Sequence, residues 1–126
     1  FIDREVLIRK PFEVEDYSYE YFAHQEITGN LSITSGISGD TETIVKFASI
    51  FAEEELDGVE EMTKDALGEF MNSQNGLFVS NLYHKNINSD LNPQGFDMNG
   101  SLSKRTHLFV LPCELTFGKI DIIFNI

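Results

Sequence analysis

The 126-residue sequence has a single cysteine, few basic residues and no long apolar run. Cys113 has no second cysteine with which to form an internal disulfide, and the first residues are not a positively charged, apolar signal segment. We therefore expect a cytoplasmic location. Since no apolar stretch approaches the length needed to cross a bilayer, we also expect a soluble protein.

Basic residues are outnumbered, with 9 Lys and Arg against 21 Asp and Glu and a formal net charge of −12. Such a charge repels a phosphate backbone instead of neutralising it. We therefore expect neither nucleic acid nor an anionic membrane surface as a partner.

Several catalytic patterns are missing as well. The sequence has no Gly-rich phosphate loop, no Gly-Xaa-Ser-Xaa-Gly elbow and no pair of His at zinc spacing. His24, His84 and His107 stand apart, and we interpret each as a surface or packing residue. Cys113 is interpreted as a buried, inert thiol. We expect no metal and no other cofactor of the chain's own.

What the sequence does contain is enough for one packed core. An apolar content of 41% with 11 Phe is typical of a globular protein, and 126 residues is the size of one ordinary domain. We expect a single domain over residues 1–126, in which residues 1–20 form an edge strand or an extended arm. Since the first residue is Phe1 and not Met, we expect the chain to be part of a longer protein.

The first half predicts a hairpin and then a helix. Residues 21–27 and 31–35 alternate around Thr28-Gly29-Asn30, a hairpin signal, and the second strand is expected to break at Gly36 and Gly39. Residues 41–55 show apolar residues at helical spacing, with Asp40 or Thr41 as the expected N-cap. The acidic end of that helix, residues 53–55, is expected to lie in solvent.

Residues 59–85 predict one long helix, for which Asp57 and Glu60 supply a start signal. Residues 73–76 are poor helix formers, so two alternatives are open at Gly76. Either the helix ends there, or the glycine is kept because another element packs closely against the backbone. One face of this helix is predicted to be the core face, and it comprises Val59, Met62, Ala66 and Phe70.

The second half predicts a loop and a closing hairpin. Residues 86–100 are rich in Asn, Asp, Pro and Gly, which is loop chemistry. Residues 106–116 and 119–126 predict two strands, and the mostly apolar last strand suggests a central or interface position. The order of elements indicates an α+β fold of two layers, with two long helices packed on a largely antiparallel sheet.

A polar stripe lies beside the core face of the long helix. Asp65, Glu69 and Asn72 project within an arc of about 60°. With Gly76 and Pro93 beyond them, this spacing resembles the signature of the CheC/CheX/FliY family of chemotaxis phosphatases, and the single-copy layout is most similar to CheX. The resemblance extends over about residues 21–126. Residues 1–20 depart from it, because strand-like sequence stands where the family usually has an N-terminal helix.

The resemblance implies a phosphatase that hydrolyses the aspartyl phosphate of a response-regulator receiver domain in two-component or chemotaxis signalling. Asn72 would position the water, since an amide both donates and accepts hydrogen bonds. Glu69 would dock the receiver by pairing with its Lys. Gly76 and Pro93 would support the site, and Asp65 is equally compatible with support or with an ordinary exposed position. The phosphorylated Asp and its Mg²⁺ would belong to the partner.

Two other functions are compatible with the sequence. The chain could be a catalytically silent binding or dimerisation module that holds a partner with its acidic surface. A small-ligand enzyme with Glu69 as general base has less support, since no companion acid, nucleophile or cofactor loop is evident. In each case the resemblance and the apolar last strand favour a homodimer formed through a sheet edge.

Overall fold

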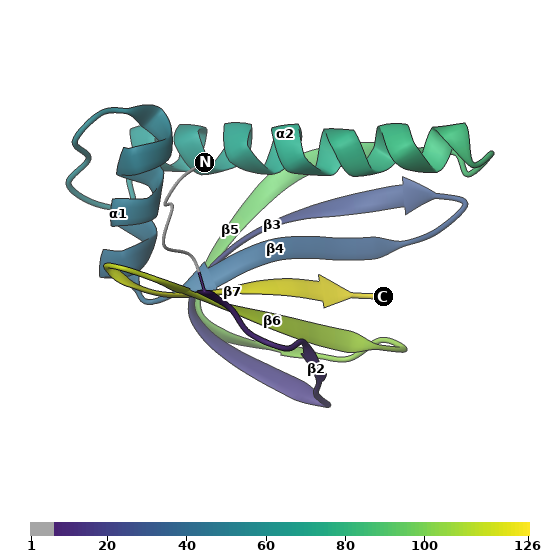
Figure 1. Cartoon of the computed structure of the whole chain (residues 1–126), viewed down its shortest axis with the longest axis horizontal. Helices are drawn as coiled ribbons and strands as arrows, with labels where there is room; N and C mark the ends of the chain where they lie inside the picture. The colour runs from purple at the N-terminus through teal and green to yellow at the C-terminus, as the bar shows by residue number, and fades with distance from the viewer. Residues whose placement is uncertain (1–6) are drawn as a thin grey trace.

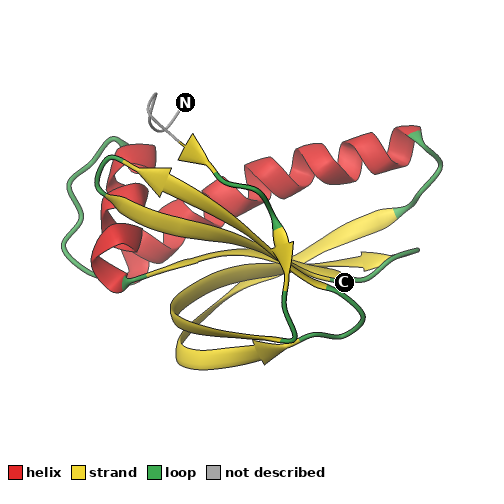
Figure 2. Cartoon of the chain, turned by 60° about the horizontal axis from the view of Figure 1, so that its bottom comes forward, coloured by secondary structure: helices red, strands yellow, loops and turns green. Residues whose placement is uncertain are grey.

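The computed structural model describes residues 7–126, which form one antiparallel sheet with two helices on one face (Figures 1 and 2). The elements follow the order β1 (Leu7–Ile8), β2 (Phe12–Glu13), β3 (Asp16–Gly29), β4 (Ile33–Gly39), α1 (Thr41–Ala52), α2 (Glu61–His84), β5 (Ser89–Ser103), β6 (Leu108–Leu115) and β7 (Gly118–Asn125). Among these residues the strand order is β1-β6-β7-β4-β3-β5, and β2 also pairs with β6. The predicted α+β fold is confirmed, although α1, with 12 residues, is half as long as α2.

The N-terminal segment was expected to be an edge strand or an arm. Residues 1–6 lie outside the described part of the chain. Residues 7–13 agree with an edge position, because β1 and β2 pair with β6 through Leu7↔Glu114 and Phe12↔Val110. Residues 16–20 do not, because they begin β3, which lies between β4 and β5. No helix precedes Thr41 among the residues that the structure describes.

The first hairpin is confirmed, but its second strand does not break at Gly36. β4 continues to Gly39, and Gly36 lies in its interior against β3. A Cβ atom at Gly36 would come within 2.6 Å of the Phe22 ring and would also clash with the Ala23 carbonyl oxygen. The glycine therefore permits a close approach of two strands instead of ending one.

Both helices lie close to their predicted ranges. The Asp40 carboxylate caps α1 by accepting a hydrogen bond from the Thr43 amide at 2.8 Å, and residues 53–55 are exposed as expected. α2 runs unbroken through Gly76 to His84, which confirms one long helix. The start signal at Asp57 is wrong, because α2 begins at Glu61 and Glu60 is its N-cap without a side-chain hydrogen bond.

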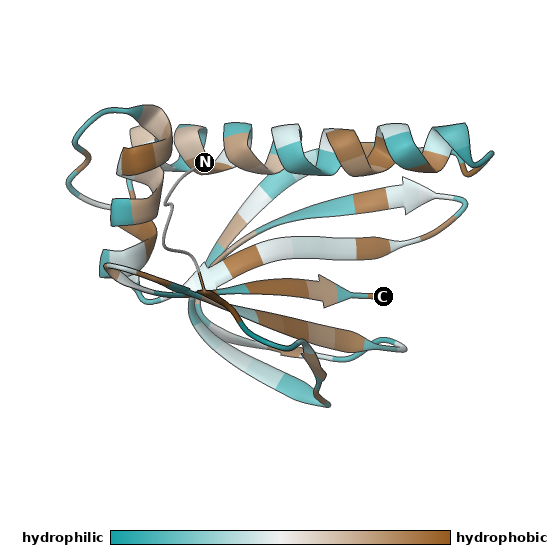
Figure 3. Cartoon of the chain, in the orientation of Figure 1, coloured by the Kyte–Doolittle hydropathy of each residue, from teal (hydrophilic) through white to brown (hydrophobic). Residues whose placement is uncertain are grey.

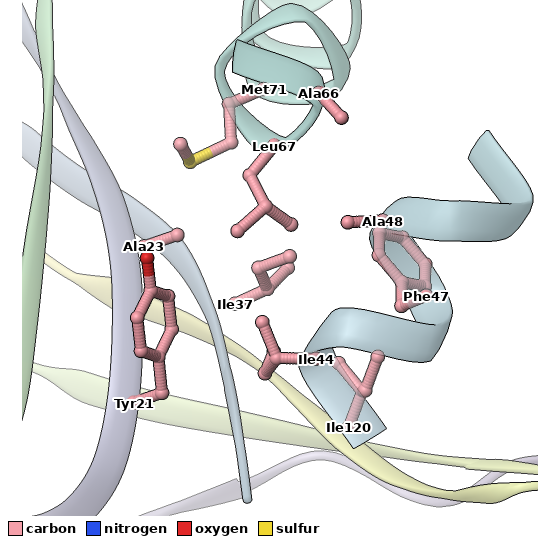
Figure 4. Close-up of a cluster of buried hydrophobic side chains, with 10 residues drawn as sticks. All are labelled: Tyr21, Ala23, Ile37, Ile44, Phe47, Ala48, Ala66, Leu67, Met71 and Ile120. Carbon is pink, nitrogen blue, oxygen red and sulfur yellow. The ribbon is translucent and has the colours of Figure 1, made fainter. Parts of the chain in front are cut away.

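The predicted core face of α2 is confirmed in part, because Ala66 is buried and Val59 and Phe70 pack against the core, whereas Met62 is exposed. Met62 is 55% exposed, Val59 precedes the helix, and Phe70 turns toward Phe47 and Phe51 of α1. α2 packs against the sheet and α1 together, so its central contact is made by Leu67, which Figure 4 shows amid the core side chains. The residues of α2 that are buried are Thr63, Ala66, Leu67, Gly68, Met71 and Asn75.

The predicted loop over residues 86–100 is wrong, since most of it belongs to β5. β5 is an edge strand that pairs only with β3. Some of the residues that suggested a loop lie where the pairing between these two strands is irregular. Near Pro93 the register shifts between Gln25↔Gln94 and Ile27↔Leu91, which leaves one extra residue in β5. Asn99 has φ of 52°, at the point where pairing skips from Gly100 to Met98. An edge strand with bulges tolerates such residues, so pairing with β3 overrides local propensity.

The closing hairpin is confirmed as β6 and β7. β7 lies between β6 and β4, so its apolar residues belong to the middle of the sheet (Figure 3). Opposite the helices the curled sheet encloses a second, smaller core of buried residues, which are Phe22, Leu108, Val110 and Ile123. The predicted central position of the last strand is therefore confirmed.

Candidate functional site

The polar stripe of α2 lines a groove beside β5. Asp65, Glu69 and Asn72 are all exposed, and they share a groove of about 530 Å³. Gln94 and Phe96 of β5 form its other wall. The helical spacing predicted that the three polar side chains lie together, and the structure places them together in this groove.

Asn72 is the member of the polar stripe that is hydrogen-bonded to the sheet. Its Oδ1 accepts a hydrogen bond of 2.8 Å from Nε2 of Gln25 on β3. Gln25 is 1% exposed, and the same Nε2 donates to the Asn92 carbonyl oxygen at 2.8 Å. Oε1 of Gln25 accepts from Nδ2 of Asn75 at 2.9 Å. Asn72 is thus the exposed end of a chain of side-chain amides, in which the buried Gln25 bonds to both Asn72 and Asn75.

Sequence reasoning missed Gln25. It lies on the helix-facing side of β3, on which Tyr21, Ala23 and Ile27 are also buried. A glutamine among these apolar positions was the available signal, because a buried amide needs partners.

Glu61 also lines the groove, but Glu69 and Asp65 are the two carboxylates of the polar stripe. Within residues 7–126 neither carboxylate forms an ion pair or a hydrogen bond with another described side chain. Lys64, the nearby cation on the same helix, instead lies over the Phe96 ring, 5.8 Å from its centroid. Both carboxylates are therefore available to a cation that approaches from outside.

At Gly68 the backbone of α2 is joined to Gln94 of β5. Gly68 is buried, and a Cβ there would lie 3.4 Å from Cδ of Gln94. Nε2 of Gln94 donates to the Gly68 carbonyl oxygen at 3.3 Å. The contact joins the middle of α2 to the strand that carries Pro93.

Gly76 and Pro93 occupy different places from the stripe. Gly76 lines a separate groove nearer the end of α2, with Gly29 and Tyr83, and a Cβ there would meet nothing within 4 Å. Neither alternative for Gly76 is therefore correct, since the helix continues and no element packs on the glycine. Pro93 lies in β5 at the register shift, directly after Asn92, whose carbonyl binds Gln25.

The remaining candidate ligands do not gather into a site. In the part of the chain that the structure describes, no three His, Cys, Asp or Glu side chains are grouped to hold a metal ion. Nε2 of His24 lies 2.7 Å from Asp97, and Nδ1 of His107 lies 2.7 Å from Glu13. Cys113 is buried, as predicted, and burial raises the pKa of its thiol.

The two helices can also be assessed as candidate membrane spans. Neither α1 nor α2 combines the length with the apolar character that a membrane-spanning helix would need, among the residues described.

Comparison with known proteins decides the family. The family model described as chemotaxis phosphatase CheX matches residues 21–114, which is most of the chain. The chain belongs to the CheX family. The match includes α1, α2 and β5, and so contains Asp65, Glu69, Asn72 and Pro93. A search among curated proteins gives no match.

Solved structures of CheX and related proteins share the fold. CheX of Desulfovibrio desulfuricans has a TM-score of 0.79 at 16% identity, with 94% of this chain and 83% of that chain covered. CheX of Borrelia burgdorferi, solved as a complex with CheY, BeF3 and Mg²⁺, has a TM-score of 0.72 at 23% identity, with 96% and 82% covered. FliY of Thermotoga maritima has a TM-score of 0.62 at 14% identity, with 94% and 74% covered.

Proposed function

We propose that this chain is a phosphatase that hydrolyses the aspartyl phosphate of a response-regulator receiver domain. The observation that carries the proposal is the groove of a CheX-family member in which an unpaired carboxylate, Glu69, lies next to a tethered amide, Asn72. The solved complex of Borrelia burgdorferi CheX with CheY, BeF3 and Mg²⁺ supports a receiver domain as the partner.

In this proposal Asn72 is the catalytic residue. An aspartyl phosphate is already reactive, so its hydrolysis is limited largely by holding a water in line with the bond that breaks. The water oxygen attacks phosphorus, the bond from phosphorus to the receiver's carboxylate oxygen breaks, and inorganic phosphate leaves. The exposed end of the Asn72 amide can donate and accept hydrogen bonds, which suits it to hold that water.

Glu69 is the docking residue. Its carboxylate is exposed and unpaired among the described residues, so it can form a charge-assisted hydrogen bond to the Lys beside the receiver's phosphate. The Mg²⁺ and the phosphorylated Asp belong to the receiver. Asp65 lies in the same groove and supports the negative potential that favours an approaching cation.

Replacing Asn72 tests the proposal. We expect Asn72→Ala to lower the stimulated rate of phosphate loss on the order of 10²-fold, as when a positioning amide is removed from other active sites. The measurement is inorganic phosphate released from phosphorylated receiver domains of the same cell, with and without the protein. Asn81→Ala removes an exposed amide elsewhere on α2 and serves as the control.

Two outcomes would contradict the proposal. If Asn72→Ala releases phosphate as fast as the unmodified protein, Asn72 does not position the water. If the unmodified protein binds the receivers without accelerating phosphate loss, the chain is the silent binding module that the sequence also allows.

A further inference from the structure

We infer that Gln25 is a positioning residue that fixes which end of the Asn72 amide faces the partner. The inference rests on the proposed function, and it concerns a residue of β3 that is 47 positions from Asn72 in the sequence. Gln25 does not reach the groove itself, because it is 1% exposed.

The backbone carbonyl oxygen of Asn92 determines the direction of the hydrogen bonds among the side-chain amides of Gln25, Asn72 and Asn75. The Asn92 carbonyl oxygen can only accept a hydrogen bond, so the end of Gln25 that faces it at 2.8 Å is the NH2 group. That group has two hydrogens, and the second points to Asn72 at 2.8 Å. Asn72 must therefore turn an acceptor, its Oδ1, toward Gln25.

The other end of Gln25 fits the same orientation. Its Oε1 is left as an acceptor, and Nδ2 of Asn75 donates to it at 2.9 Å. Asn75 is itself buried, with 7% of its surface exposed. A reversed Gln25 would set two acceptors against each other at Asn92, which is costly where water cannot intervene.

The consequence appears at the exposed end of Asn72. With Oδ1 bound to Gln25, the amide directs its Nδ2 donors and the remaining lone pair of Oδ1 away from β3. An untethered Asn would populate both orientations of its terminal torsion. Gln25 therefore presents one arrangement of donor and acceptor before the receiver arrives, which lowers the ordering cost of the reaction.

The same geometry gives Pro93 a role. Asn92 directly precedes Pro93 at the point where β5 has one extra residue opposite β3. Pro93 has no N–H to offer the ladder, and the Asn92 carbonyl accepts its hydrogen bond from the Gln25 side chain. The irregularity of β5 thus supplies the fixed acceptor on which the orientation of Gln25 depends.

Gln25→Met tests the inference, because methionine has a similar length and no hydrogen-bond donor. We expect kcat for phosphate release from a phosphorylated receiver to fall about tenfold, with KM unchanged because Glu69 is untouched. Asn125→Leu is the matched control: it removes another buried amide, one that bonds to Ser103 and Arg105 and not to Asn72, and should leave kcat near its original value.

A second measurement separates positioning from a general loss of structure. In the Asn72→Ala background, Gln25→Met should cause no further fall in kcat, because Gln25 acts only through Asn72. A purely structural role would lower kcat by the same factor in both backgrounds. Thermal unfolding of each variant confirms that folded protein is compared.

If Gln25→Met does not fold, Gln25→Glu replaces it, since the carboxylate keeps the size but accepts where the amide donates. An unchanged kcat in the folded variant, or an equal loss in both backgrounds, overturns the inference while Asn72→Ala alone still supports the proposed function. An unchanged rate in Asn72→Ala overturns both.

Discussion

At the scale of single residues, Glu69 and Asn72 differ in how they are held. Asn72 accepts a hydrogen bond from Gln25, whereas the Glu69 carboxylate has no hydrogen bond or ion pair among the described residues. A tethered side chain suits a step that needs one geometry, and a free charge suits an encounter with a partner. The two positions are only three residues apart, yet the fold restrains one side chain and leaves the charge of the other unpaired among the described residues.

The free charge of Glu69 leads to a separate prediction. Glu69→Gln keeps the size of the side chain and removes its charge, so we expect KM for the phosphorylated receiver to rise about tenfold with a smaller change in kcat. Steady-state phosphate release at varied receiver concentration measures both constants. Glu54→Gln, on the exposed acidic end beyond α1, is the control. A fall in kcat at constant KM would assign Glu69 to the chemical step instead.

The sequence alone could place Asp65, Glu69 and Asn72 together, because helical spacing is a local property. It could not place Gln25 beside Asn72. That contact depends on how α2 is placed over β3 in the fold, and no local sequence pattern specifies this placement. Pro93 was recognised as part of the signature, but its local composition pointed to a loop. Only its partner strand shows that it marks a bulge.

At the scale of elements, the helices and both hairpins follow from periodicity, while the orientation of α2 does not. Residues on adjoining arcs of a helix are similarly apolar, so small differences in packing choose between them. The Phe70 ring packs against Phe47 and Phe51 of α1, and Leu67 and Met71 join the core shared with the sheet. Similarly, β5 is a strand because β3 offers it a long, though irregular, ladder of backbone pairs, whatever the intrinsic propensity of its residues.

Two substitutions on α2 test which face is the core. Leu67 is fully buried, so Leu67→Ala should cost about 2–5 kcal/mol of unfolding free energy through lost packing and a cavity. Met62 is 55% exposed, and Met62→Ala should cost less than about 1 kcal/mol. Urea unfolding followed by circular dichroism measures both. Equal costs would favour the stripe that the sequence predicted over the one in the structure.

At the scale of the whole molecule, the sheet ends in β5 on one side and in β1 and β2, paired to β6, on the other. β7 lies inside the sheet, so its apolar residues are explained by neighbouring strands and give no separate reason for a dimer. The expectation of a homodimer therefore rests on the family resemblance and on the open edges of the sheet.

Light scattering tests the homodimer. We expect a mass of twice the 14.3 kDa of one chain, because an edge strand offers unpaired backbone groups to a second copy. The measurement is repeated over a range of protein concentrations, so that a weak dimer is seen to dissociate. A mass of one chain at every concentration would contradict the expectation.

The tether of Asn72 also bears on the order in which the chain acquires its structure. Gln25 and the Asn92 carbonyl that orients it are 67 positions apart, and both helices lie between them. Closing a loop of this length is entropically costly, so contacts of this kind form after local helices and hairpins. During synthesis α2 can exist before β5 has left the ribosome, but its asparagine has no fixed orientation until β5 adds to the sheet. The competence of the groove is therefore acquired only when β5 adds to β3, the strand that carries Gln25.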